Sequence, residues 1–328
     1  MHDHAEAIGG QRVRRFAREC SAFVALQLVL FAALQVPYLR LHYRDHYLDA
    51  WLDKHARLAS VPPPRLLLVG GSSWAFGVLS PRLERELGRP VVNLALHAGL
   101  GREFILREGE AAVRPGDVVV LSLEYALLTP ESPPDVPTLL DLLTRGPQAA
   151  RFVAPRQAPL LLDQALGYVA KRPRALALDA WYGAPGGGVV YSRRAFNKQG
   201  DVVAHRVYGA SYGLLRHAGL TIQPNQLDPA IERLNAFARR VQAAGARAFL
   251  SLPPIPSDDR NRQRERLALM RLRFQAQLRI PVLEPEVPGY TRNLFFDTAY
   301  HLTRKGARRR TTALIAALRA ALATPPLY

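Results

Sequence analysis

Two adjacent serines, Ser72 and Ser73, stand in a pattern that can present a nucleophile. They follow an apolar run at residues 66–69 and the pair Gly70 and Gly71. An apolar run bounded by turn residues is typical of a buried strand in a parallel sheet, and open α/β sheets bind ligands at the carboxyl ends of such strands. We therefore expect a reactive serine at this turn. The alternative is a strand-to-helix turn in which serine only caps the helix.

A second pair lies near the C-terminus, where Asp297 precedes His301 by four residues. Residues four apart share a face of a helical turn, so the carboxylate can hold the imidazole in one tautomer and stabilise its cation. A serine hydroxyl needs an oriented base of this kind to act as a nucleophile at neutral pH. Taken singly, the two residues also fit a helix-capping carboxylate and a surface histidine. Together with the serines they predict Ser-His-Asp chemistry.

These segments resemble the SGNH/GDSL hydrolase superfamily, whose first block reads Gly-Asp-Ser with a glycine four residues after the serine. Gly71, Ser72, Ser73 and Gly77 match that block with serine in place of aspartate. The family's last block reads Asp-x-x-His, and the C-terminal pair matches it with one extra residue. The chain is most similar to the membrane-anchored SGNH-like branch, which includes alginate O-acetylation proteins and the D-alanine-transfer protein of teichoic acids. The resemblance implies Ser73 as the nucleophile, with Ser72 as the alternative.

Members of the family supply two further donors to the oxyanion, a glycine in the second block and an asparagine in the third. The resemblance implies Gly99 for the first of these. Where the asparagine is expected, after the third predicted strand, the chain has Glu124 and Tyr125. An ionised carboxylate accepts hydrogen bonds and cannot donate them. Three interpretations remain open: Tyr125 replaces the asparagine, Glu124 binds a substrate hydroxyl, or the site is weakly active.

The rest of the chain alternates strands with helices, as a doubly wound parallel sheet requires. We expect a flavodoxin-like (SGNH) three-layer α/β domain at residues 65–328, with a Pro/Gly-punctuated insertion at about 130–225. Insertions of this kind often carry lids or substrate loops. Asn197 in the insertion is a candidate substrate contact, although an ordinary β-turn explains it as well. The predicted strands cover about residues 65–69, 90–95, 117–124, 246–252 and 280–283, and the predicted helices about residues 80–87, 102–113, 228–244 and 303–322.

An uncharged stretch from Ser21 to Tyr38 has about the length of a membrane-spanning helix once its flanks are included. We predict a cytoplasmic tail at residues 1–20, a transmembrane anchor at 21–40 and a linker at 41–64. A cleaved signal peptide is the rival interpretation, but no small-x-small cleavage pattern precedes Tyr38. Arginines are more frequent before the stretch than after it, which by the positive-inside rule keeps the N-terminus in the cytoplasm. The domain is then expected on the periplasmic side of a bacterial inner membrane.

Composition narrows the expected partners. The 328 residues include 44 Lys and Arg against 27 Asp and Glu, which gives a formal net charge of +17. This charge favours anionic lipid head groups or an acidic polymer, unless the arginines only solvate helix faces. Nucleic acid is not expected, because the charge is spread along the chain and follows a predicted anchor. The single cysteine, Cys20, cannot form an internal disulfide, and no His/Cys cluster has metal-ligand spacing.

The combined expectation is a serine-dependent O-acyltransferase or carboxylic ester hydrolase that acts on O-acyl groups, chiefly acetyl, of a cell-envelope polysaccharide. The resemblance implies that Ser73 attacks the ester, His301 accepts its proton and Asp297 orients His301. The amides of Ser73 and Gly99 then face the oxyanion. No cofactor is needed, and the resemblance alone implies a membrane O-acyltransferase as partner. Two alternatives remain: a catalytically weak or inactive scaffold or carbohydrate-binding protein, and a simple carboxylesterase.

Overall fold

The computed structural model describes residues 14–27, 29–30, 33, 45–130, 132–171, 174, 181, 188–209 and 222–324. Its internal contacts divide the chain into two units. One unit consists of Asp45–Asp163 and Gly187–Tyr328, and the other of Met1–Arg44 and Gln164–Gly186. We call the first the α/β unit, because it holds the sheet and every candidate site residue.

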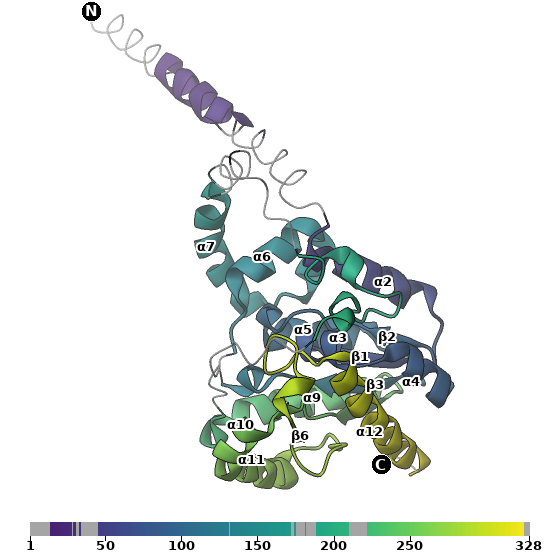
Figure 1. Cartoon of the computed structure of the whole chain (residues 1–328). Coiled ribbons are helices and arrows are strands. Elements are labelled where there is room, and N and C mark those ends of the chain that lie inside the picture. The colour runs from purple at the N-terminus through teal and green to yellow at the C-terminus, as the bar shows by residue number, and fades with distance from the viewer. Residues whose placement is uncertain are drawn as a thin grey trace, which may run out of the picture. The chain divides into compact units, whose positions relative to one another are not determined.

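A four-stranded parallel sheet forms the centre of the α/β unit (Figure 1). In spatial order the strands are β2 (Val91–Asn93), β1 (Leu66–Gly70), β3 (Val118–Ser122) and β4 (Arg247–Leu250). A parallel bridge from Leu250 to Val282 continues the sheet beyond β4, where the sequence predicts a strand at 280–283. Parallel neighbours require a crossover connection between each pair of strands. The predicted α/β class and parallel sheet are therefore confirmed.

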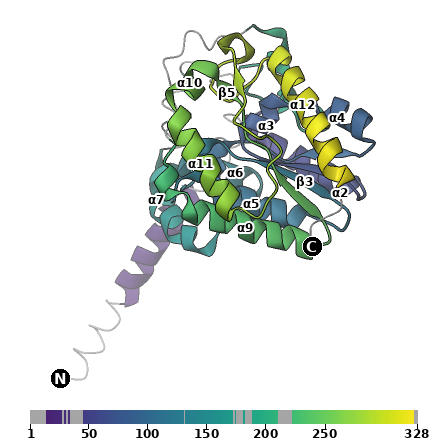
Figure 2. The same ribbon diagram turned by 90° about the horizontal axis from the view of Figure 1, so that it is seen from below.

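Different helices cover the two faces of the sheet, because side chains alternate along β1. Leu66 and Leu68 belong to a core cluster with α12, whereas Leu67 and Val69 belong to the cluster that includes α5 and α9. Figure 2 shows α12 on one side of β3, with α5 and α9 on the other. This arrangement is consistent with a three-layer α/β fold. The covering helices are α4 (Ser80–Leu87), α5 (Gly101–Ala112), α9 (Asp228–Ala243) and α12 (Arg304–Ala323).

Several elements differ from the expectations. Residues 50–60, expected within a linker, form α2 (Ala50–Ser60), and Trp51 on this helix is 1% exposed and packs in the core. This segment of the predicted linker is therefore helical, and its apolar residues are spaced for one buried helix face. Further helices and strands are α3 (Ser72–Gly77), α6 (Val136–Arg145), α7 (Ala158–Ala170), β5 (Ile255–Pro256), α10 (Ser257–Arg262), α11 (Arg264–Gln277) and β6 (Gly289–Tyr290). Short 3-10 helices cover Tyr47–Asp49, Ala98–Leu100, Tyr125–Leu128, Pro147–Phe152, Pro155–Gln157, Arg193–Ala195, Ala204–Val207, Pro224–Gln226 and Arg292–Leu294.

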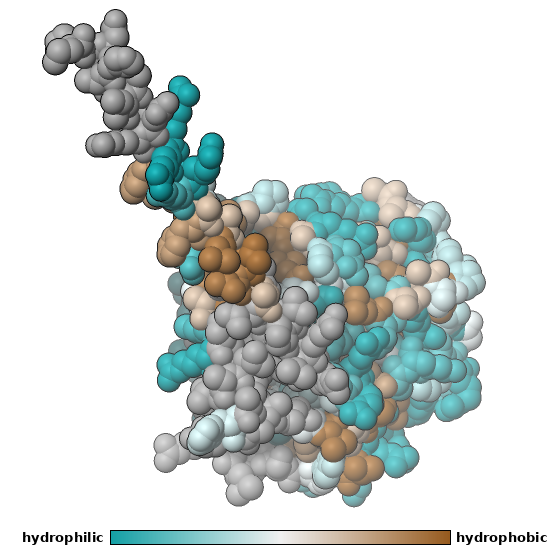
Figure 3. All heavy atoms as spheres, turned by 90° about the horizontal axis from the view of Figure 1, so that it is seen from above, coloured by the Kyte–Doolittle hydropathy of each residue, from teal (hydrophilic) through white to brown (hydrophobic). Residues whose placement is uncertain are grey.

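The N-terminal segment is helical at residues 14–27 and exposes both charged and apolar side chains (Figure 3). Phe23, Val24 and Leu26 are among its exposed apolar residues. The anchor predicted at residues 21–40 includes positions 28, 31–32 and 34–40, which lie outside the described residues. Within the described ranges, no helix is long and apolar enough to cross a membrane. The anchor and the orientation of the N-terminus remain predictions.

Candidate active site

The serine turn lies at the carboxyl end of β1, and close packing there requires glycine. A Cβ on Gly70 would lie 2.0 Å from the carbonyl oxygen of Ser122, the last residue of β3. The two serines that follow are in different environments. Ser72 is partly exposed, whereas Ser73 is fully buried and its hydroxyl has no hydrogen-bond partner among the described residues. A nucleophile must reach its substrate, so the exposure favours Ser72 over the predicted Ser73.

Phe76 connects the serine helix to the C-terminal histidine. Its ring stacks on the His301 ring, with centroids 3.9 Å apart and planes 7° from parallel. Phe76 follows Ser72 by four residues, so the two side chains share one face of α3. Ser72 therefore lies on the side of α3 that faces His301. Among the described residues, the Ser72 hydroxyl donates to Glu124 and the Ser73 hydroxyl has no partner, so neither is hydrogen-bonded to His301.

The predicted bond between Asp297 and His301 is present, with 2.7 Å between Oδ1 and Nδ1. It does not use a helical turn, because α12 begins only at Arg304. The pair lies instead in a bend, where the hydroxyl of Thr298 accepts the backbone N–H of His301 at 3.0 Å. A proton on Nδ1 leaves Nε2 as the ring's acceptor. The arrangement therefore gives an oriented base, although for a different local reason than the spacing suggested.

Tyr191, which lies in the predicted insertion, is a second hydrogen-bond partner of Asp297. Its hydroxyl donates to Asp297 Oδ2 and lies 3.3 Å from His301 Nδ1. Burial raises the pKa of Asp297, but the hydrogen bonds from His301 and Tyr191 outweigh burial, so the pKa is lowered overall. The carboxylate is thus kept ionised beside the imidazole. Sequence reasoning missed Tyr191 as a site residue, since no local pattern links it to residues more than a hundred positions away.

The carboxylate of Glu124 packs directly against the serine turn. Its Oε1 accepts the Ser73 N–H at 2.7 Å and the Ser72 hydroxyl at 3.4 Å. The other oxygen, Oε2, is buried without a partner among the described residues, and a Cβ on Gly71 would lie 2.2 Å from it. Burial raises the pKa of Glu124, against the opposing effects of the Ser73 amide and the charges of His301 and Arg310. The Ser73 amide is not open to an oxyanion while Glu124 accepts from it.

The other two candidate oxyanion donors also have partners. The Gly99 N–H donates to His97 Nδ1 at 2.9 Å. The Tyr125 hydroxyl is buried and donates to the Pro253 carbonyl at 2.9 Å, so it does not replace the expected asparagine. Glu124 is 3% exposed, which leaves it little surface for a substrate hydroxyl. In this geometry neither Tyr125 nor Glu124 supplies the expected donor, and weak activity of the site stays a prediction.

Arg310 of α12 contacts α3 and the end of β3. Sequence reasoning also missed this residue. Its guanidinium donates to the Ser73 carbonyl at 2.7 Å and to the Ser122 hydroxyl at 2.9 Å. It lies 3.8 Å from the centre of the Trp74 ring. Burial lowers its pKa to about 10, so it stays charged at neutral pH. A cation on the helix stripe that also carries Leu314 and Leu318 was the available sequence signal.

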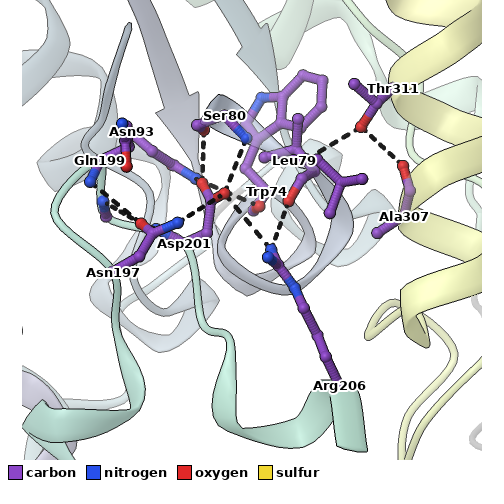
Figure 4. Close-up of polar contacts among 12 residues, drawn as sticks. Trp74, Leu79, Ser80, Asn93, Asn197, Gln199, Asp201, Arg206, Ala307 and Thr311 are labelled. Carbon is purple, nitrogen blue, oxygen red and sulfur yellow. Dashed lines mark hydrogen bonds and ion pairs between the residues drawn. The ribbon is translucent and has the colours of Figure 1, made fainter. Parts of the chain in front are cut away.

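Asn197, the candidate substrate contact, lies in a different cluster. Its side-chain oxygen accepts the backbone N–H groups of residues 199–201, and its nitrogen donates to Asp201 at 3.3 Å. Asp201 is fully buried and also accepts from the backbone and hydroxyl of Ser80, from Asn93 and from Arg206 (Figure 4). Asn197 therefore acts in a turn that presents Asp201, and the turn interpretation fits better than substrate binding.

Within the described ranges, no group of three or more His, Cys, Asp or Glu side chains is arranged to hold a metal ion. The arrangement around the serine turn consists of a partly exposed serine, a histidine held by aspartate and tyrosine, and a buried glutamate beside the serine amide. No protein-family model matches this chain, and comparison with curated proteins finds no significant match.

Proposed function

We propose that this protein is a serine-dependent acyltransferase or esterase of the SGNH type that acts on O-acyl groups, chiefly acetyl, of a cell-envelope polysaccharide. The observation that carries the proposal is the Asp297–His301 hydrogen bond in a loop whose histidine stacks on the helix of the serine turn. A strand-end serine turn and an oriented base, supplied from opposite ends of one α/β unit, are the parts that covalent acyl transfer needs. The polysaccharide substrate, the anchor and a membrane O-acyltransferase partner rest on the resemblance.

In the proposed mechanism Ser72, rather than Ser73, is the nucleophile. Its hydroxyl oxygen attacks the ester carbonyl while Nε2 of His301 accepts the proton, and Asp297 stabilises the resulting imidazolium. Collapse of the tetrahedral intermediate releases the alcohol, which takes the proton back from His301, and leaves an acyl group on Ser72. A sugar hydroxyl or water then attacks the acyl carbon while Nε2 of His301 accepts its proton. The Ser72 oxygen leaves and takes that proton from His301, and the acyl group ends on the sugar or as the free acid. Partial exposure and a shared face with Phe76 support Ser72 in this role.

Glu124 sets the expected rate of this reaction. It occupies the Ser73 amide that an oxyanion would otherwise use, and it stands where the resembled family has a donor. Loss of one oxyanion donor costs about 10²–10³ in rate in other hydrolases. We therefore propose slow turnover, with acylation of the serine easier to observe than catalysis.

A non-catalytic scaffold is the second candidate, and the position of Glu124 is the specific observation that favours it. With the serine amide and the Gly99 amide both satisfied by side chains, the arrangement is stable without substrate. In that case the Asp297–His301 pair would only brace the C-terminal loop. The simple carboxylesterase differs from the first proposal in substrate alone.

Serine labelling separates these candidates. We expect the full chain to react with a fluorophosphonate probe, and mass spectrometry to place the adduct on Ser72. Ser72→Ala should abolish labelling, while the matched neighbour Ser73→Ala should retain it at a comparable rate per folded molecule. Labelling on Ser73 would restore the original assignment. A folded protein that no probe labels, and whose Ser72→Ala form still supports normal polysaccharide acylation in cells, would establish the scaffold.

A further inference from the structure

A hollow of about 660 Å³ on the α/β unit lies apart from the serine turn and has five arginines in its wall. It is formed between α4, the first turn of α12 and the 3-10 helix Ala204–Val207. Its volume falls in the range of about 300–1,000 Å³ that is usual for small-molecule sites. The lining residues are Leu79, Pro81, Arg82, Arg85, Arg206, Arg304 and Arg308. We call it the arginine pocket.

The arginine pocket has more positive charge than the protein neutralises. Arg82 pairs with Glu86 at 2.6 Å, and Arg206 lies 3.4 Å from Asp201. Arg304 and Arg308 are exposed, and neither forms an ion pair with any residue that the structure describes. Burial and the charge of Arg304 both lower the pKa of Arg206, against the opposing effect of Asp201. The guanidiniums therefore repel one another across a space that an anion can fill.

The wall of the pocket is held in place by partly buried hydrogen bonds. Arg206 donates to the Val78 carbonyl at 2.8 Å, and its guanidinium is directed at Asp201 (Figure 4). On the adjoining side, the Leu79 N–H donates to the Thr311 hydroxyl at 3.0 Å, which ties the start of α4 to α12. A site whose cations are positioned in advance loses less conformational entropy when it binds. The pocket is thus pre-formed on two of its sides.

The amino-terminal end of α12 carries cations, although the dipole of a helix makes this end unfavourable for positive charge. The first turn of α12 has no acidic residue and begins with Arg304 and Lys305, and Arg308 stands at the start of the next turn. The positive end of the helix dipole disfavours cations in this turn and favours anions. Natural proteins break such local rules at functional sites and compensate for them elsewhere in the structure. An anion bound beside Arg304 and Arg308 would offset this unfavourable placement.

We propose that the arginine pocket binds a ligand with two or more phosphate groups. The planar guanidinium matches phosphate oxygens with paired hydrogen bonds. A phosphate monoester carries a charge of about −1.5 to −2 at neutral pH, so paired phosphates balance several arginines where one carboxylate cannot. The same chemistry comes from a free diphosphate or from the head groups of anionic phospholipids. This proposal does not depend on whether the serine site is active.

The test measures binding of inorganic pyrophosphate to the full chain by isothermal titration calorimetry. The double variant Arg304→Ala/Arg308→Ala removes two exposed pocket cations, and we expect it to weaken binding at least about tenfold, since each charge-assisted hydrogen bond contributes roughly that much. The matched control is Lys305→Ala/Arg309→Ala, which removes two charges from the same turns of α12 but none from the pocket lining. The control should bind within about threefold of the unmodified protein, and thermal unfolding confirms that both variants are folded.

Vesicles of phosphatidylcholine with and without phosphatidic acid distinguish the source of the phosphate. If binding to the acidic vesicles falls selectively in the pocket variant, the ligand is a lipid head group. If only pyrophosphate binding falls selectively, the ligand is a free phosphate compound. Absence of pyrophosphate binding at millimolar concentration, or equal weakening in both double variants, would overturn the proposal. Tighter binding of trigalacturonate, which offers only carboxylates, would overturn the assignment to phosphate.

Discussion

Two aspartates of the α/β unit, Asp201 and Asp297, both gather hydrogen bonds from distant parts of the chain, but their surroundings differ. Asp201 is fully buried, and donors from Ser80, Asn93, Asn197 and Arg206 surround its two oxygens. Asp297 has a side chain that is 22% exposed, and its partners are one histidine and one tyrosine. The oxygens of the first carboxylate are surrounded by donors of the fold, whereas the second holds a histidine whose Nε2 has no hydrogen bond to a described residue. Saturation of a buried carboxylate thus indicates a structural role, and an oriented, incompletely satisfied partner indicates a functional one.

We expect the largest effect on activity from substitutions that remove or misorient the base, His301. In His301→Ala or Asp297→Asn, turnover of p-nitrophenyl acetate should fall by about 10³–10⁴-fold, because the serine loses its proton acceptor or the acceptor loses its tautomer. Combining His301→Ala with Ser72→Ala should add little, since triad members act as one unit. Steady-state kinetics and serine labelling measure both effects. If His301→Ala retains most of the activity, the Asp297–His301 pair is not catalytic, and its contrast with Asp201 no longer separates a functional carboxylate from a structural one.

The second prediction concerns the saturated carboxylate. Asp201→Ala should reduce the free energy of unfolding by about 3 kcal/mol or more, because it leaves buried donors unpaired and removes the carboxylate that faces the Arg206 charge. Activity per folded molecule should change little. Asp228→Ala, which removes an exposed carboxylate paired with Arg273, is the control and should cost less than about 1 kcal/mol. Denaturant unfolding followed by circular dichroism gives the comparison, and an Asp201→Ala protein of unchanged stability contradicts it.

Glu124 provides an intermediate case, a buried carboxylate with one satisfied oxygen. Glu124→Asn shortens the side chain, releases the Ser73 amide and supplies a donor, so turnover should rise by about tenfold or more. Burial raises the pKa of Glu124. The turnover of the unmodified protein should therefore approach that of Glu124→Asn as the pH falls through this raised pKa. A neutral carboxyl group can donate a hydrogen bond, and an ionised one cannot.

A pH–rate profile of both proteins is the measurement for this prediction. Glu124→Ala serves as the control, because it releases the amide without adding a donor, and its gain should be smaller. A fall in turnover for Glu124→Asn at every pH would assign Glu124 to the chemistry itself rather than to an obstruction of the oxyanion site.

The smallest effect tests the second partner of Asp297. Tyr191→Phe removes one hydrogen bond and keeps the ring, so the catalytic constant should fall by about threefold to tenfold with KM unchanged. Stability should change by less than about 1 kcal/mol, since the hydroxyl group lies at a partly exposed position. An equal loss in stability and in activity would mean that Tyr191 only anchors its loop.

Much of the sheet was predictable because its signals are local. Apolar runs bounded by turn residues marked β1, β3 and β4, and helical periodicity with Gly245 as a stop marked α9. The site was predictable to the level of its residue types: a serine turn after the first strand and an Asp–His pair before the last helix. The choice between Ser72 and Ser73 was not, because it depends on which side of α3 faces His301.

The amino-acid sequence by itself therefore determined the α/β class, the strand-end serines and the Asp297–His301 pair. Only the tertiary structure decided that Ser73 is buried, that Glu124 occupies its amide and that Tyr191 reaches Asp297. These outcomes come from side chains that are distant in sequence and meet in three dimensions, where burial and the supply of hydrogen-bond donors set their roles. The same reason explains the arginine pocket, whose cations are unremarkable along the chain and become a site only when α4 and α12 are joined.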